Sequence, residues 1–291
     1  MATEPAPGLR SDWLNGWLAA LGVTALLPGV RLSWTSEAVP AAQFSVPDHL
    51  SPLAETLALA MPSLEALDGL AVARRRPPGA DFGRRVSPEV FSERAGLARI
   101  SGDWSLSSTV TDLVAELPDE GLPHSPFDPS APQGRTLWER VVGCRRLITD
   151  PAPSITATLA GRGKRARSNG LGFDVQRLVA GVQDAEKQVD PVVELLAFAG
   201  LELMPFRGDG KSARARGWSG PPSRPGSFRW YAWAEALDRW GIDAFLDVVM
   251  GREVRPEEQA RLGVVARYHS VPYQALGSAD PTRAYAAARE G

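Results

Sequence analysis

The stretch DPVVELLAFAGLELMPF, residues 190–206, decides the fold that we expect for this chain. Asp190 is a favourable N-cap residue, and Pro191 suits the first helical position because its missing N–H needs no partner there. The helix that follows is apolar on nearly every side and stops at Gly200, which is typical of a helix in a protein interior. We therefore predict a buried central helix, with a strand over residues 201–206 directly behind it.

The pattern before this stretch predicts a helix over residues 12–27 with one apolar face, which Ser11 or Asp12 can cap. Alternating apolar and polar residues predict a half-buried strand over 30–35. The remaining predicted elements are a strand at 43–46, a helix that opens at Ser51, a short helix at 110–117, a helix behind the capping box of Thr136 and Glu139, a strand at 228–233, a helix at 242–249 and a strand at 264–273.

Helices and strands in this order show no regular βαβ rhythm, so the predicted class is α+β, with mixed helices and short strands around one core. Residues 118–135 are rich in proline and are a candidate boundary between two lobes, residues 1–134 and 135–291, that share an interface. The alternative is a single domain. Glycine-, proline- and arginine-rich stretches at 74–88, 161–170 and 207–226 are predicted to be exposed loops.

Composition excludes several classes of protein. With 291 residues, 44% hydrophobic and 23% charged, the chain is long and apolar enough to fold around a real core. It has no run of eighteen apolar residues, and the acidic, proline-rich start does not resemble a signal peptide. Its single cysteine, Cys144, cannot form an intramolecular disulfide. We expect a cytoplasmic protein that does not enter a membrane.

Motifs for catalysis are weak. The three histidines, His49, His124 and His269, lack a second ligand at metal spacing, and Cys144 is expected to be a buried small hydrophobe. The run Gly210-Lys211-Ser212 imitates a phosphate-binding loop, but Pro205 stands where that loop needs a glycine. The sequence therefore predicts neither an enzyme nor a bound metal or cofactor.

Two basic clusters are the strongest functional signal. The first comprises Arg162, Lys164, Arg165 and Arg167, and the second comprises Lys211, Arg214, Arg216 and Arg224 with Trp218 among them. Such clusters attract phosphate backbones by counterion release, and an exposed tryptophan can stack on an unpaired base. The sequence predicts a nucleic-acid-binding surface, with both clusters at one end of the structure. The alternative is two solvated, charged loops.

Several segments resemble CRISPR-associated proteins of the type I-G (formerly I-U) systems, and most closely the family named as an extension of the helicase-nuclease. They are residues 14–23 (LNGWLAALGV), 30–34 (VRLSW), 125–129 (SPFDP), 168–174 (SNGLGFD), 192–201 (VVELLAFAGL), 204–206 (MPF), 216–218 (RGW) and 228–230 (FRW). The resemblance implies a non-enzymatic accessory role in antiviral defence, binding crRNA or target nucleic acid or docking on other effector subunits. No helicase or nuclease motif stands in the chain.

Two other functions remain open. A small hydrolase could assemble its site from scattered residues such as Asp174, His269 and Glu202. A protein-interaction scaffold could use an aromatic surface around Trp230 and Trp233.

Overall fold

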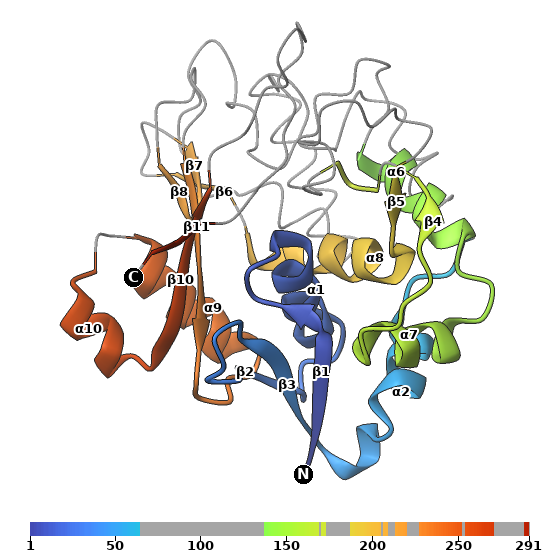
Figure 1. Ribbon diagram of the computed structural model, residues 1–291, viewed down its shortest axis with the longest axis horizontal. Coiled ribbons are helices and arrows are strands. Elements are labelled where there is room, and N and C mark those ends of the chain that lie inside the picture. The colour runs from blue at the N-terminus through green and yellow to red at the C-terminus, as the bar shows by residue number, and fades with distance from the viewer. Residues whose placement is uncertain are drawn as a thin grey trace, which may run out of the picture.

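The computed structural model describes residues 1–64, 137–168, 170–172, 187–204, 206–208, 213–219, 227–251, 254–270 and 288–290. Helices and short antiparallel strands occur together, which confirms the α+β class. Figure 1 shows two helices at the centre, a three-stranded sheet below them and a four-stranded sheet beside them.

The described helices are α1 (Leu14–Leu26), α2 (Leu53–Ala60), α6 (Leu137–Arg146), α7 (Pro151–Leu159), α8 (Pro191–Gly200), α9 (Arg239–Gly251) and α10 (Pro256–Arg261). The first sheet has the order β1-β3-β2, with β1 (Ala2–Arg10), β2 (Arg31–Trp34) and β3 (Ala41–Val46). The second has the order β11-β10-β9-β8, with β8 (Trp218–Ser219), β9 (Ser227–Trp233), β10 (Val264–Ser270) and β11 (Ala288–Glu290). Two short ladders pair β4 (Ala166–Arg167) with β5 (Gln188–Val189), and β6 (Phe206–Gly208) with β7 (Ala213–Ala215).

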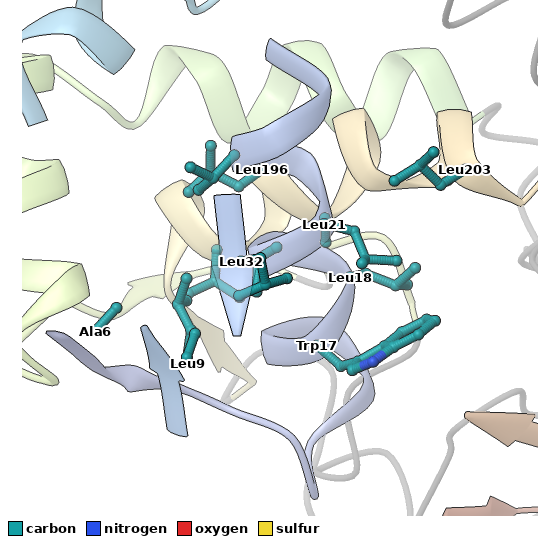
Figure 2. Close-up of a cluster of buried hydrophobic side chains, with 14 of the residues drawn as sticks. Ala6, Leu9, Trp17, Leu18, Leu21, Leu32, Leu196 and Leu203 are labelled. Carbon is teal, nitrogen blue, oxygen red and sulfur yellow. The ribbon is translucent and has the colours of Figure 1, made fainter. Parts of the chain in front are cut away.

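Helix α8 is the predicted central helix. Asp190 caps it by accepting a hydrogen bond from the N–H of Val192 (3.0 Å), and all but one of its residues are buried. It packs along α1, of which residues 14–25 are all buried. Figure 2 shows Leu18 and Leu21 of α1 in one apolar cluster with Leu196 of α8. Both helices also contact other elements, including β1 and β2 around α1 and α6 and α7 around α8, so the faces that point away from each other are covered as well.

Two glycines set the distance between these helices. A Cβ atom on Gly22 would lie 1.8 Å from the carbonyl oxygen of Leu196, and one on Gly200 would lie 2.0 Å from that of Leu18. No side chain fits in either place, so the backbones touch there. The close contact explains why both helix segments contain a glycine near their ends.

One hydrophobic cluster contains residues from both halves of the chain. Three buried tryptophans tie the halves together through their indole N–H groups: Trp17 donates to the carbonyl oxygen of Tyr231 (2.8 Å), Trp230 to that of Ser11 (2.7 Å) and Trp233 to that of Leu32 (3.1 Å). Because Trp230 and Trp233 are fully buried, the alternative of an aromatic interaction surface around them is wrong. The candidate lobe boundary at 118–135 lies outside the described residues.

Strand β1 is an element that the sequence pattern did not predict, because Pro5 and Pro7 argue against a strand. Among the described strands β1 lies at the edge of its sheet and pairs with β3 alone, and Pro5 lies opposite Gln43. A proline is tolerated at an edge, where its missing N–H can point away from the neighbouring strand.

Two local predictions are wrong. The N-cap of α1 is Trp13, with no side-chain cap: the hydroxyl of Ser11 instead lies 2.9 Å from that of Tyr268, and Asp12 pairs with Arg10. Residues 201–204 do not form the predicted strand. Leu201–Leu203 continue α8 as a 3₁₀ turn, and β6 starts at Phe206.

Other predicted elements are confirmed with small shifts of boundary: β2, β3, α2, β9, α9 and the start of β10. The capping residue Thr136, the predicted helix at 110–117 and the predicted loop at 74–88 lie outside the described residues, although α6 begins directly after Thr136. Among the described helices, none is both long and apolar enough to span a bilayer.

Candidate nucleic-acid interface

The first basic cluster lies on a segment that we call the basic hairpin, residues 161–168, which runs from the end of α7 into β4. Its cations, Arg162, Lys164, Arg165 and Arg167, are all exposed. None of the four side chains forms a hydrogen bond or ion pair with another residue in the described part of the chain. Their charges therefore face water, as the sequence analysis expected.

The start of the hairpin is fixed by the way in which α7 ends. Gly161 adopts a left-handed φ of 73° and donates to the carbonyl oxygen of Thr158 (2.9 Å), while Arg162 donates to that of Ala157 (2.7 Å). This pair of bonds is the Schellman pattern, which needs glycine at the left-handed position. Gly8 of β1 packs against the same turn, where a Cβ atom would lie 1.9 Å from the oxygen of Thr158.

Asp190 anchors the middle of the hairpin to α8. Besides capping the helix, its carboxylate accepts a hydrogen bond from the hydroxyl of Thr158 (2.7 Å). A Cβ atom on Gly163 would lie 1.8 Å from Asp190 Oδ2, so the hairpin backbone rests directly on this carboxylate. Burial raises the pKa of Asp190, and the hydrogen bonds from Thr158 and Val192 and the charge of Arg165 oppose that rise.

Glu194 anchors the chain just beyond the hairpin. Its buried carboxylate accepts hydrogen bonds from the N–H of Leu171 (2.6 Å) and from the side-chain amide of Asn15 (2.6 Å). Gly170, with a φ of +51°, packs so closely that a Cβ atom there would lie 2.5 Å from the Glu194 carboxyl group. Since Asp190 and Glu194 are four residues apart, they lie on the same face of α8.

Sequence reasoning gave neither carboxylate this role in positioning the hairpin. The available signal was Glu194 itself, a lone charged residue in an apolar helix. A charged group in such a helix is either at the surface or buried with partners. Because Asp190 and Glu194 hold the backbone of the hairpin and the residues just beyond it, the hairpin is ordered before a ligand binds. This lowers the conformational entropy lost on binding.

The second basic cluster is different. Lys211 and Arg224 lie outside the described residues. Arg214 lies in β7 opposite Arg207 of β6, and Trp218 lies in β8 opposite Phe228 of β9. At Arg214 and Trp218 the structure thus defines how the backbone pairs with the neighbouring strand.

Arg216 does not face solvent, which corrects its assignment to a phosphate-binding surface. Its side chain is 3% exposed and donates to the carbonyl oxygen of Leu203 (2.8 Å) and to the carboxylates of Asp243 (2.7 Å) and Asp247 (2.6 Å). A guanidinium that is already paired in the interior cannot reach a phosphate without losing these bonds. Arg216 is a structural residue that joins the end of α8 to α9.

The two clusters are also not at one end of the structure. The basic hairpin contacts the N-terminus of α8, whereas β6 and β7 follow its C-terminus. Ten helical residues span about 15 Å. Figure 1 shows β4 and β7 on opposite sides of α1. The prediction of a single combined surface is wrong, because the central helix separates the two segments.

Of the residues suggested for a hydrolase, the structure describes His269 and Glu202. Asp174 lies outside the described residues, His269 lies in β10 opposite Arg229, and Glu202 forms an ion pair with Arg239. Burial raises the pKa of Glu202, and the neighbouring Arg239 charge opposes that rise.

Cys144 is buried, as expected, and burial raises the pKa of its thiol, which makes it a poor nucleophile. In the described part of the chain, no group of three His, Cys, Asp or Glu side chains could hold a metal ion. Comparison of the chain with protein-family models, curated proteins and solved structures finds no match.

Proposed function

We propose that this protein is a cytoplasmic, non-enzymatic component of a CRISPR antiviral defence system and that it binds nucleic acid through the basic hairpin. The observation that carries the binding proposal is the exposure of Arg162, Lys164, Arg165 and Arg167 on a backbone anchored by Asp190 and Glu194. Four cations on a fixed frame can replace the counterions of several phosphates at little entropic cost.

The chemistry of the hairpin favours contacts to the phosphate backbone. Residues 161–168 contain glycine, alanine, serine, arginine and lysine, and no aromatic ring that could stack on a base. Arginine and lysine therefore supply charge and hydrogen bonds without reading sequence. We expect binding to be sequence-tolerant and strongly dependent on salt.

The assignment to CRISPR defence is supported by the sequence resemblance. Three of the resembling segments contribute to one buried contact, since Asn15, Leu171 and Glu194 are joined by hydrogen bonds. The fold therefore gives these short motifs a common structural role. Genes for a CRISPR array and effector subunits beside the gene for this chain would support the assignment, and their absence would contradict it.

The binding proposal is tested with the full chain and fluorescein-labelled single-stranded and duplex RNA and DNA, by anisotropy at several salt concentrations. The variant R162A/K164A/R167A should bind more weakly to every sequence. Its plot of log affinity against log salt should be flatter by about 2 units for single strands and about 2.7 for duplexes. Arg165 is kept because its charge faces Asp190.

The matched control is R31A/R255A/R261A, which removes the same charge from three other exposed positions. It should keep the affinity and salt slope of the parent chain. An equal loss of affinity in both variants would show that binding depends on the overall charge of the chain and not on the basic hairpin. No loss of affinity in the hairpin variant would refute the proposal.

A further inference from the structure

The most exposed aromatic side chain among the described residues lies on α9, away from the basic hairpin. Trp240 is 64% exposed and Val248 is 39% exposed, and Ala244 and Gly251 are exposed as well. Residues 240, 244, 248 and 251 are one helical turn apart, so they form one stripe, which we call the α9 stripe. The opposite side of α9 is buried in the core.

Trp240 has a charged neighbour although it is exposed. The guanidinium carbon of Arg239 lies 5.0 Å from the centroid of the Trp240 ring, within the range of a cation–π contact. Arg239 is itself fixed by its ion pair with Glu202. A tryptophan that keeps most of its surface in water is typical of the anchor residue of a protein interface.

The surroundings of the stripe are acidic. Asp243 and Asp247 lie along one edge of it and remain 33% and 41% exposed while they accept hydrogen bonds from Arg216. Glu235 and Asp238 lie in the loop that leads into α9. Within residues 239–251 the only cation is the buried Arg239.

This charge decides between possible occupants. Arg216 neutralises only one of the two charges of Asp243 and Asp247, so together with Glu235 and Asp238 the region stays negative and would repel a phosphate backbone. A second copy of the chain, related by a two-fold axis, would place the same acidic edge against itself. A partner segment with an apolar face and flanking cations would complement both the apolar α9 stripe and the acidic residues beside it.

We propose that the α9 stripe is a docking site for a basic amphipathic helix of a partner protein. The thirteen residues of α9 are about 20 Å long, which matches an apolar face of three to four turns. Gly241, Ala244 and Gly251 allow a partner helix to approach closely beside Trp240. Its lysines or arginines would lie along Asp243 and Asp247. This proposal does not depend on nucleic-acid binding.

The test uses the full chain and a fluorescein-labelled 18-residue helical peptide of leucine and lysine, with the leucines on one face. Anisotropy should show binding that weakens as salt is raised, and a leucine–glutamate peptide of the same pattern should not bind. Trp240→Ser should weaken binding by at least about tenfold. Val248→Lys, which places a cation in the stripe without touching Arg239, should also weaken it.

Leu59→Ser is the matched control, because Leu59 is 88% exposed on α2, outside the stripe. It should leave binding unchanged, and so should R162A/K164A/R167A. The proposal is overturned if the leucine–lysine peptide does not bind, if the leucine–glutamate peptide binds equally well, or if Leu59→Ser weakens binding as much as Trp240→Ser. Sedimentation that shows a dimer dissociated by Val248→Lys would also overturn it, in favour of a second copy.

Discussion

The segments GRGKRAR (161–167) and ARARG (213–217) have nearly the same composition, yet the structure uses their arginines in opposite ways. In the first, the neighbouring carboxylates of Asp190 and Glu194 accept hydrogen bonds from backbone N–H groups and neutral side chains, and the cations stay in water. In the second, Asp243 and Asp247 bind the guanidinium of Arg216 and bury it. A cluster of arginines becomes a surface or a structural ion pair according to where tertiary contacts place the nearest carboxylates.

The largest expected effect separates these two uses of arginine. Arg216→Met removes one partner of a buried ion pair and should lower the free energy of unfolding by about 2–4 kcal/mol, somewhat less than for a fully buried pair because both carboxylates are partly exposed. Arg167→Met, at an exposed position, should change it by less than about 0.5 kcal/mol. Urea unfolding of both variants measures the difference. Similar losses would show that Arg167 also has a structural partner.

A second substitution tests whether the basic hairpin really rests on α8. Gly163→Ala places a methyl group against the Asp190 carboxylate and should destabilise the fold by about 1–3 kcal/mol through overpacking. Gly143→Ala in α6 is the control, since a Cβ atom there would have no atom within 4 Å. It should stabilise the chain by about 0.5–1 kcal/mol, because alanine favours a helix. Thermal unfolding distinguishes the two, and a neutral Gly163→Ala would contradict the close contact.

The pH dependence of stability tests the burial of Asp190. Because its pKa is raised in the folded state, the native protein binds this proton more tightly than the unfolded chain does. The contribution of Asp190 to stability is therefore full below the ordinary aspartate pKa and is lost as pH rises through the raised value. Each unit of rise corresponds to about 1.4 kcal/mol.

Asp190→Asn removes this titration and keeps an effective N-cap. Unfolding measured from pH 4 to pH 8 should show the parent chain losing stability relative to this variant as pH increases. Taking the difference between the two proteins cancels the similar contribution of Glu202, whose pKa is also raised. A difference that does not vary with pH would contradict a buried, titrating Asp190.

The smallest expected effect on stability belongs to the hairpin cations themselves. The unfolding free energy of R162A/K164A/R167A should stay within about 0.5 kcal/mol of the parent value, or rise slightly at low salt as like charges are removed. Melting curves at two salt concentrations measure this. A large loss would mean that these side chains support the fold, and any loss of nucleic-acid affinity would then have a second explanation.

Much of the fold followed from local pattern. The capped, apolar α8, the apolar face of α1 and the alternating strand β2 were predicted from the periodicity of apolar residues, and β9 was predicted from its aromatic residues. Strand β1 was not predicted because its prolines are acceptable only at the edge of a sheet, and the position of a strand in a sheet is not visible in its own sequence. The turn at Leu201–Leu203 was predicted as a strand because a short apolar run is compatible with a strand and with a buried helical turn equally well.

The sequence by itself determined the apolar character of α8, its N-cap and its final glycine, and the apolar face of α1, since these depend on neighbours within a turn or two. It also showed where positive charge is concentrated. Only the tertiary structure decided which cations remain in water, because that choice depends on carboxylates distant in sequence: Asp243 and Asp247 reach Arg216 across 27 and 31 residues. The same holds for Asn15 and Glu194, which are 179 residues apart and meet because two glycine-bearing helices pack backbone against backbone.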